Sequence, residues 1–426
     1  MARTLIDRRR FLSTTMAAAA AAIASPHVRA QGAGPRVVVV GGGFGGAACA
    51  RALRKADPRI AVTLVEQSRT YTASPMSNAV IAGLRDLPAQ QFGYDKLAGA
   101  GITVALSAAS AIDPHARSVT LADGSKLAYD RLVVSPGIDF RWGAIPGYDE
   151  AAAATMPHAY KGGDQIALLR RQLESMEDGG LVAISAPVNP ARCPPAPYER
   201  ASLIAYYLKR NKPRSKIVIL DAKDNFAMRE LFEEGWKALY PGLIEWFPVG
   251  SSGLVTSVDA KTRTLTTDFD KYKAAVANVI PPQKAGHAGE LAGVADRTGW
   301  CPVDPMTFES KLQPNVHVIG DAAIAGAMPR AASAAQAQAQ ICADAIAALF
   351  AGKTPAAPTL RSSCFSLIAP DYAISQRSTF RPANGQYEES PPGIVVSPRN
   401  AAAAVRSGEA KEADAWFAEI TATVFG

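Results

Sequence analysis

The chain has 426 residues, of which 48% are hydrophobic and 19% charged, a composition typical of a globular protein with two or three domains. The net charge is +7, but the first 30 residues contribute +4, and the remainder shows no basic stripe with interleaved aromatic residues. This charge balance argues against a nucleic-acid-binding protein.

The N-terminal segment predicts export. Arg8 and Arg9 precede a weakly apolar stretch, MAAAAAAIA, and small residues flank Arg29 at a cleavage position after Ala30. We therefore expect a twin-arginine signal peptide over residues 1–30 and delivery of the folded protein to the periplasm. The alternative is a membrane anchor, which needs ~20 strongly apolar residues. No other segment is long and apolar enough, so no transmembrane segment is expected.

A dinucleotide-binding motif follows. The apolar run RVVVV (36–40) predicts a buried parallel strand, and Gly41, Gly43 and Gly46 form the pattern GxGxxG at the start of a helix. The next predicted strand ends at Glu66, whose carboxylate can bind the ribose hydroxyls of an adenosine.

Two later segments favour FAD over NAD. One is a predicted strand that runs into Ser135-Pro136-Gly137. The other, NVHVIGDAA (315–323), ends in Gly320-Asp321, where the aspartate can accept a hydrogen bond from a flavin hydroxyl. The alternative for Asp321 is a simple helix cap. We therefore predict a discontinuous FAD-binding domain over residues 31–152 and 276–352.

Residues 153–275 predict a second βαβ domain without a nicotinamide-binding turn. After the apolar strand LVAIS (181–185) the chain reads APVNPARCPP, which contains no glycine and four prolines that supply no N–H donor. The pattern argues against NAD(P)H and places Cys193 in the turn. Cys364, in RSSCFSLIAP, is a candidate partner, whereas Cys49 and Cys342 fit helix cores and Cys301 is less clear. No CxxC pair occurs, so no metal site is expected.

Several long motifs resemble the flavoprotein subunit of flavocytochrome c sulfide dehydrogenase: RCPPAPYERASLIAYYLK, VIPPQKAG, GWCPVDPMTFES, HVIGDA and CFSLIAP. The resemblance extends over essentially the whole chain after the signal peptide. It implies an α/β fold with two Rossmann-like domains of the glutathione-reductase type and a small C-terminal α+β interface domain (353–426). It also implies that FAD is the cofactor and a c-type cytochrome subunit the electron acceptor.

The resemblance assigns roles to particular residues. The family's redox disulfide maps onto Cys193 and Cys364, an active-site acid onto Glu199, and a tryptophan near the flavin onto Trp416. Ser74 (Ala73 if the register shifts by one) stands where many members carry a cysteine bonded to FAD, so we expect FAD to be bound without a covalent link. The predicted cofactor-binding residues are Gly41, Gly43, Phe44, Gly46, Glu66, Gln67, Ser74, Asn78, Pro136, Gly137, Gly320 and Asp321.

The expected activity is the oxidation of sulfide or polysulfide at the disulfide, followed by electron transfer to the cytochrome. The chain contains no CxxCH motif, so any haem belongs to another subunit. Alternatives are a sulfide:quinone oxidoreductase, a thiol or persulfide oxidoreductase, and an accessory flavoprotein of a sulfur-oxidising system. For Glu199 the alternative is a helix-start carboxylate, and for the cysteines it is a structural disulfide or two free thiols.

Overall fold

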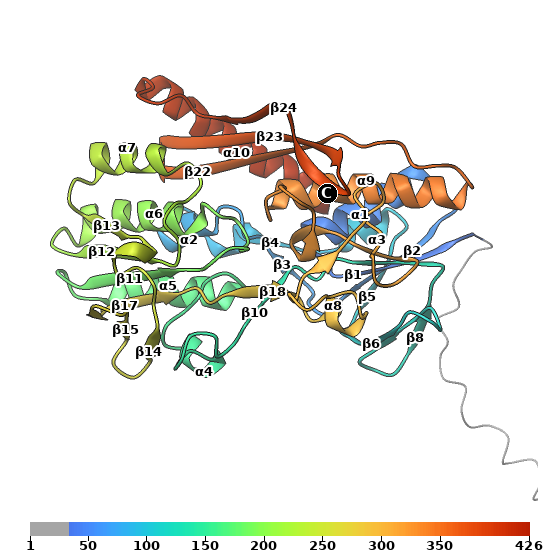
Figure 1. The fold of residues 1–426 in the computed structure, drawn as a ribbon, viewed down its shortest axis with the longest axis horizontal. Coiled ribbons are helices and arrows are strands. Elements are labelled where there is room, and N and C mark those ends of the chain that lie inside the picture. Colours follow the sequence, from blue (N-terminus) through green and yellow to red (C-terminus); the bar gives the residue numbers. More distant parts are fainter. Residues whose placement is uncertain (1–33) are drawn as a thin grey trace, which may run out of the picture.

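The computed structural model describes residues 34–426, which form three parts packed on one another (Figure 1). The predicted signal peptide lies outside the described residues. Within residues 34–426, no helix has both the length and the apolar character needed to cross a bilayer.

The first part is built on a five-stranded parallel sheet in the order β20-β9-β1-β2-β5. Strand β1 lies in the middle because its four valines are apolar on both faces. Helix α1 follows it after the glycine-rich turn and packs against α9. The small antiparallel sheet β6-β7-β8 precedes β9. The bounds are β1 Arg36–Val40, α1 Phe44–Ala56, β2 Ala61–Glu66, β5 Thr103–Leu106, β6 Ala109–Asp113, β7 Ser118–Leu121, β8 Lys126–Ala128, β9 Arg131–Val134, β20 Val316–Val318 and α9 Ala332–Phe350.

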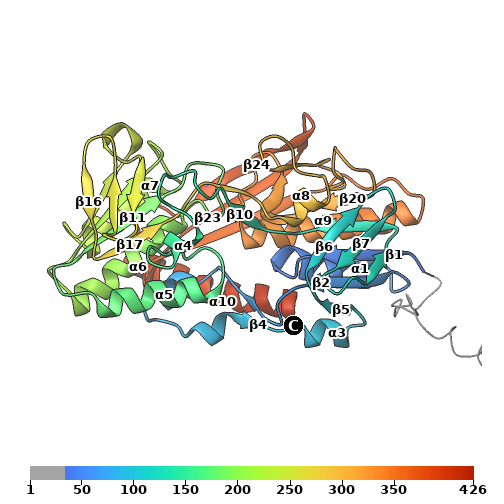
Figure 2. The ribbon, with the colours of Figure 1, turned by 90° about the horizontal axis from the view of Figure 1, so that it is seen from below.

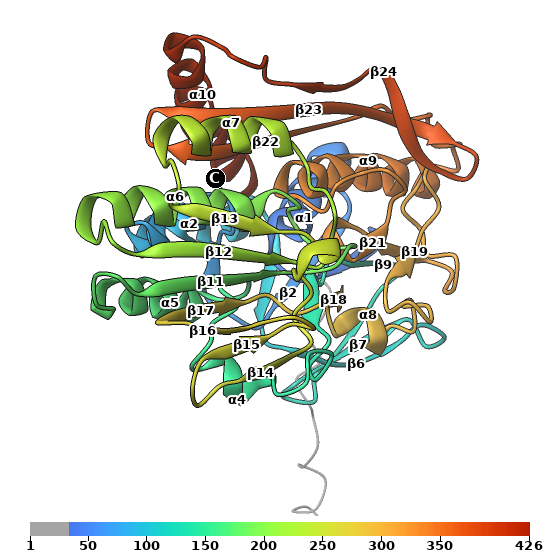
Figure 3. The same cartoon turned by 60° about the vertical axis from the view of Figure 1, so that its left-hand side comes forward.

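The second part contains a four-stranded parallel sheet in the order β13-β12-β11-β17. Figure 3 shows these strands side by side, with α6 between the sheet and the C-terminal strands; α7 contacts α6 and β22. The bounds are α5 Gly163–Ser175, β11 Leu181–Ala186, α6 Ala196–Asn211, β12 Lys216–Asp221, α7 Arg229–Leu239, β13 Ile244–Phe247 and β17 Val276–Val279.

One predicted boundary was wrong. Residues from 276 onward are predicted to belong to the first domain, whereas β17 pairs in parallel with β11 of the second. All four residues of β17 are buried, and such a short apolar run fits either sheet. The chain returns to the first domain at β18 (Gln283–Ala285), which pairs with the outgoing β10 (Ile138–Phe140). The two crossings between the domains therefore lie side by side.

The third part is an antiparallel sheet in the order β22-β23-β24 followed by α10. Strand β22 contacts α6 of the second part and α9 of the first, so this sheet spans both (Figure 1). Seen from below, the sheets of the two larger parts lie at opposite ends of the molecule (Figure 2). The predicted α/β fold with two parallel-sheet domains and a C-terminal α+β domain is confirmed. The bounds are β22 Leu360–Ala369, β23 Tyr372–Ala383, β24 Gln386–Val396 and α10 Ala403–Phe425.

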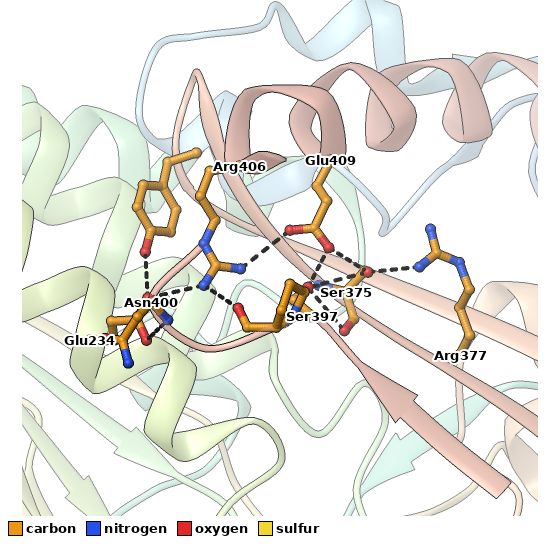
Figure 4. A network of polar contacts seen from close by, with 9 residues as sticks. Glu234, Ser375, Arg377, Ser397, Asn400, Arg406 and Glu409 are labelled. Atoms are coloured by element: carbon orange, nitrogen blue, oxygen red, sulfur yellow. Dashed lines mark hydrogen bonds and ion pairs between the residues drawn. The ribbon is translucent and has the colours of Figure 1, made fainter. Parts of the chain in front are cut away.

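A buried polar network joins the third part to the second (Figure 4). The side chain of Arg406 on α10 is 1% exposed and donates to Glu234 Oε1 on α7 over 3.0 Å. It also lies 3.4 Å from Glu409 Oε2. Glu409 in turn accepts hydrogen bonds from the hydroxyls of Ser375 and Ser397. The network fixes α7 relative to β23, and hence to the neighbouring β22.

Candidate functional site

A cavity of about 620 Å³ lies where the three parts meet. Its volume is within the range of small-molecule and cofactor sites. Gly46, the last glycine of the motif, packs against the backbone of Gly41. The other predicted site residues all line the cavity: Gly41, Gly43, Phe44, Glu66, Gln67, Ser74, Asn78, Pro136, Gly137, Cys193, Glu199, Gly320, Asp321, Cys364 and Trp416.

The glycine-rich turn forms one end of the cavity. Gly41 has φ +101°, and a Cβ on Gly46 would lie 1.8 Å from the Gly41 carbonyl oxygen, so neither position tolerates a side chain. Helix α1 begins at Phe44 with no acidic residue in its first turn. Its positive dipole end is therefore available to a pyrophosphate.

Two carboxylates flank this turn. Glu66 accepts hydrogen bonds from the N–H groups of Gly42 (2.8 Å) and Ser68 (2.9 Å), which hold it at the cavity edge. Burial raises the pKa of Asp321. The Asp321 carboxylate accepts no hydrogen bond from another residue within 34–426, which leaves it available to a cofactor hydroxyl. The glycine cradle and these two carboxylates fit FAD.

The structure brings Cys193 and Cys364 together, although they lie 171 positions apart in the chain. Cys193 lies in the turn after β11 and Cys364 on β22, the edge strand of the C-terminal sheet. Both are thiols in this structure, and both line the cavity wall. The neighbouring Cys364 side chain, together with burial, raises the pKa of the Cys193 thiol well above its ordinary value. This proximity makes the two cysteines a candidate disulfide pair.

The remaining cysteines lie away from the cavity. Cys49 on α1 and Cys342 on α9 are fully buried and contact each other in the helix–helix interface, which confirms their predicted place in the core. Cys301 is also fully buried.

Glu199 lies on the first turn of α6, close to Cys193. Its carboxylate accepts hydrogen bonds from the Leu367 N–H (3.0 Å) and from Asn78 Nδ2 (2.8 Å). Arg200 holds Asn78 in place by donating to its Oδ1 over 3.0 Å. Burial raises the pKa of Glu199, and the two hydrogen bonds partly oppose this. A carboxyl group with a raised pKa is suited to proton transfer near the two sulfurs.

The start of α6 offers no cradle for a second pyrophosphate. Three of the residues around it, Pro194, Pro195 and Pro197, have no N–H group. The Ala196 N–H donates to the Cys193 carbonyl, and the Glu199 N–H donates to the Pro195 carbonyl. Glu199 also adds a carboxyl group where a phosphate would approach.

Three residues of the cavity wall were missed by the sequence analysis. The ring of Tyr160 lies close to two guanidinium groups, with its centroid 5.6 Å from Arg192 Cζ and 5.1 Å from Arg200 Cζ. Arg200 is buried, and burial lowers its pKa to about 10. These positive charges favour an anionic sulfur at Cys193. Both arginines stand within RCPPAPYER and were detectable there, whereas nothing local marked Tyr160.

Comparison with known proteins identifies the family. Residues 166–281 match the family "Sulfide dehydrogenase (flavocytochrome c) flavoprotein chain, central", and residues 356–425 match "Flavocytochrome c sulphide dehydrogenase, flavin-binding". A sulfide dehydrogenase (flavocytochrome c) flavoprotein chain from Chlorobaculum thiosulfatiphilum is 64% identical over 45 residues, 11% of this chain and 94% of that relative. The chain belongs to this family. The resemblance predicted from the motifs is confirmed.

The wider relationships agree with the fold. Residues 35–169 match the pyridine nucleotide-disulphide oxidoreductase family. The mitochondrial sulfide:quinone oxidoreductase of Mus musculus is 24% identical over 297 residues, which cover 67% of this chain and 65% of that relative. The solved sulfide:quinone oxidoreductase of Aquifex aeolicus superposes with a TM-score of 0.72 at 17% identity, covering 91% of this chain and 92% of that one. These flavoprotein relationships and the cavity geometry together make FAD the cofactor of the site.

Proposed function

We propose that the protein oxidises sulfide at a Cys193–Cys364 disulfide beside FAD and passes the electrons to a c-type cytochrome subunit. The observation that carries the proposal is the contact of these two cysteines in the wall of the cavity that contains the glycine-rich turn. FAD, when bound, accepts electrons in pairs and returns them singly, which joins two-electron sulfide chemistry to a one-electron haem.

The chain's own residues perform the sulfur chemistry. Hydrosulfide attacks one sulfur of the disulfide, which becomes a persulfide, and the other cysteine leaves as a thiolate. Arg192 and Arg200, which act on the Cys193 and Tyr160 side chains through their positive charge, stabilise the resulting anion. Glu199, which lines the same cavity as Cys193, holds or releases a proton during attack and product release.

The test is anaerobic mixing of the purified protein with sulfide while the flavin spectrum is recorded. The parent and the matched control Cys301→Ala should lose the oxidised flavin absorbance, whereas Cys193→Ser and Cys364→Ser should retain it. Bleaching in Cys193→Ser or Cys364→Ser would refute the role of the disulfide. No bleaching in the parent would favour the accessory flavoprotein. Reduction of a soluble quinone in place of cytochrome c would favour a sulfide:quinone oxidoreductase.

We also propose that FAD is held without a covalent bond. Ser74, which lines the cavity, supplies a hydroxyl rather than the thiolate that a thioether requires. Acid precipitation should therefore release FAD into the supernatant, and FAD that remains with the pellet would contradict the proposal. Ser74→Cys is the matched variant, which should retain at least part of its FAD.

Export to the periplasm is part of the same proposal. Its support is the pair Arg8-Arg9 and the small residues before position 31, which lie outside the described residues. Cell fractionation should recover the parent in the periplasm and the variant R8K/R9K in the cytoplasm. Recovery of R8K/R9K in the periplasm would contradict the predicted signal.

A further inference from the structure

The end of helix α10 reaches the glycine-rich turn of the first part. Phe425, in the last turn of this helix, is 3% exposed. Its ring centroid lies 5.6 Å from that of Phe44 and 5.4 Å from that of Tyr71, and both of these residues line the cofactor cavity. The two separations are typical of favourable aromatic pairs. Phe425 therefore supports the cavity wall through two of its residues.

Tyr71 depends on this support. It lies on β3 (Tyr71–Thr72), which pairs in antiparallel fashion with β4 (Gln91–Phe92), and Tyr71 stands opposite Phe92 in the pair. A ladder of two residues on each strand has little stability of its own. Phe425 stacks on both members of the pair, with its ring plane inclined by 26° to that of Tyr71 and by 13° to that of Phe92. A side chain from the far end of the chain thus stabilises the ladder that carries Tyr71.

Tyr71 and Phe44 in turn contact the glycine-rich turn. Tyr71 Cε2 lies 3.2 Å from the position that a Cβ on Gly43 would take, so its ring packs directly on the middle glycine of the motif. Phe44 is the first residue of α1, and its ring meets that of Tyr71 edge-on at 5.7 Å. Hydrogen bonds from the N–H groups of such a turn weaken steeply when their direction changes. A small displacement of these two rings is therefore enough to weaken the binding of a pyrophosphate.

We propose that Phe425 is a positioning residue of the FAD site, which holds Tyr71 and Phe44 against the glycine-rich turn. The last turn of α10 thereby contributes to FAD retention through the residues that it packs on. This inference does not depend on the sulfur chemistry of the proposed function, because it concerns only how the cofactor is held.

The same helix offers a matched control. Phe417 lies eight residues before Phe425, about 12 Å along the helix axis, and is 2% exposed. It packs on Phe92 at 6.3 Å and lies under Arg85, whose Cζ is 4.7 Å from the ring centroid. Within residues 34–426, Phe417 forms no ring pair with a residue of the cavity wall. Phe417→Ala therefore removes a ring of equal size and similar burial without touching that wall.

The rate of FAD release tests the proposal. The FAD-loaded protein is diluted, and the increase in flavin fluorescence records the release. Two aromatic pairs of this kind are together worth about a factor of ten, so Phe425→Ala should release FAD about tenfold faster than the parent. Phe417→Ala should stay within about twofold of the parent rate. Both variants should lower the midpoint of urea unfolding to a similar extent, because both leave the same volume empty in the core.

Hydrogen exchange of the loaded variants gives a second readout, which reports the position of the turn itself. The amides of β3 and β4 should exchange about tenfold faster in Phe425→Ala than in Phe417→Ala. Equal FAD release from the two alanine variants, or release from Phe425→Ala at the parent rate, would overturn the inference. If Phe425→Ala does not fold, Phe425→Leu, which keeps an apolar side chain without a ring, should still release FAD faster than Phe417→Leu, and equal rates would overturn the inference as well.

Discussion

Replacing Arg406 by methionine tests whether the buried polar network holds the C-terminal sheet on the second domain. Arg406 is 1% exposed, and the side chains of its partners Glu409 and Glu234 are 11% and 20% exposed. Removing one partner of a buried ion pair costs about 3–5 kcal/mol, because the other charge stays buried without compensation. Glu409 keeps its hydrogen bonds from two serine hydroxyls, so we expect a loss near the lower end, about 3 kcal/mol.

Urea unfolding followed by circular dichroism measures this loss. The control Arg399→Met removes the exposed pair with Glu230, whose side chains are 62% and 68% exposed, and should cost less than about 1 kcal/mol. The double variant R406M/E409Q also removes the charge of Glu409, the more buried of the two carboxylates, and should recover part of the stability. Alkylation of Cys364 should be faster in R406M. The network holds β23, which in turn holds the neighbouring β22, so loss of Arg406 should expose Cys364 on β22 more often. A loss below 1 kcal/mol in R406M, or no recovery in the double variant, would refute the reasoning.

Two further predictions concern the first domain and acid stability. Gly46→Ala places a Cβ against the Gly41 carbonyl and so forces the turn to move. A cost of about 3 kcal/mol should weaken FAD binding about 100-fold, measured by fluorescence titration. The control is Gly99→Ala, where a Cβ would meet no atom within 4 Å, and its FAD affinity should not change. Burial lowers the pKa of His158 to about 3 and that of His317 to about 4. Below pH ~6.5 the unfolded chain binds protons that the folded protein does not, so stability is lost as the pH falls towards these values, by about 1.4 kcal/mol per pH unit for each histidine. His158→Asn should therefore make the free energy of unfolding in urea depend less steeply on pH between pH 7 and 5. An unchanged slope against pH would contradict the lowered pKa of His158.

The parts of the site that depend on local sequence were predictable. The glycine-rich turn requires glycines at fixed spacing for two reasons. Gly41 has a positive φ, and the backbone at Gly46 packs too closely against Gly41 for a side chain to fit. Glu66 follows from the end of the next strand in the same βαβ unit. These features need no knowledge of distant residues.

Features that depend on long-range packing were not predictable in the same way. Tyr160 joins the site only through tertiary packing, which brings its ring close to Arg192 in the turn before α6 and to Arg200 on α6. Strand β17 was assigned to the wrong domain because its four buried residues carry no mark of the sheet in which they pair. The pairing of Cys193 with Cys364 was inferred from the missing glycines and from the family resemblance, and no spacing in the chain requires it.

The two helix starts explain why the second domain is not expected to accept NAD(P)H. Helix α1 has no acidic residue in its first turn and a glycine cradle before it, so its N–H groups and dipole are free to bind phosphate. Helix α6 begins among prolines, its early N–H groups bond to the loop itself, and Glu199 places a carboxyl group at the same position. The turn that would bind phosphate instead positions Cys193 against Cys364. Excess NADH should therefore leave the flavin oxidised under conditions in which sulfide reduces it, and rapid reduction by NADH would show that a pyrophosphate binds without this cradle.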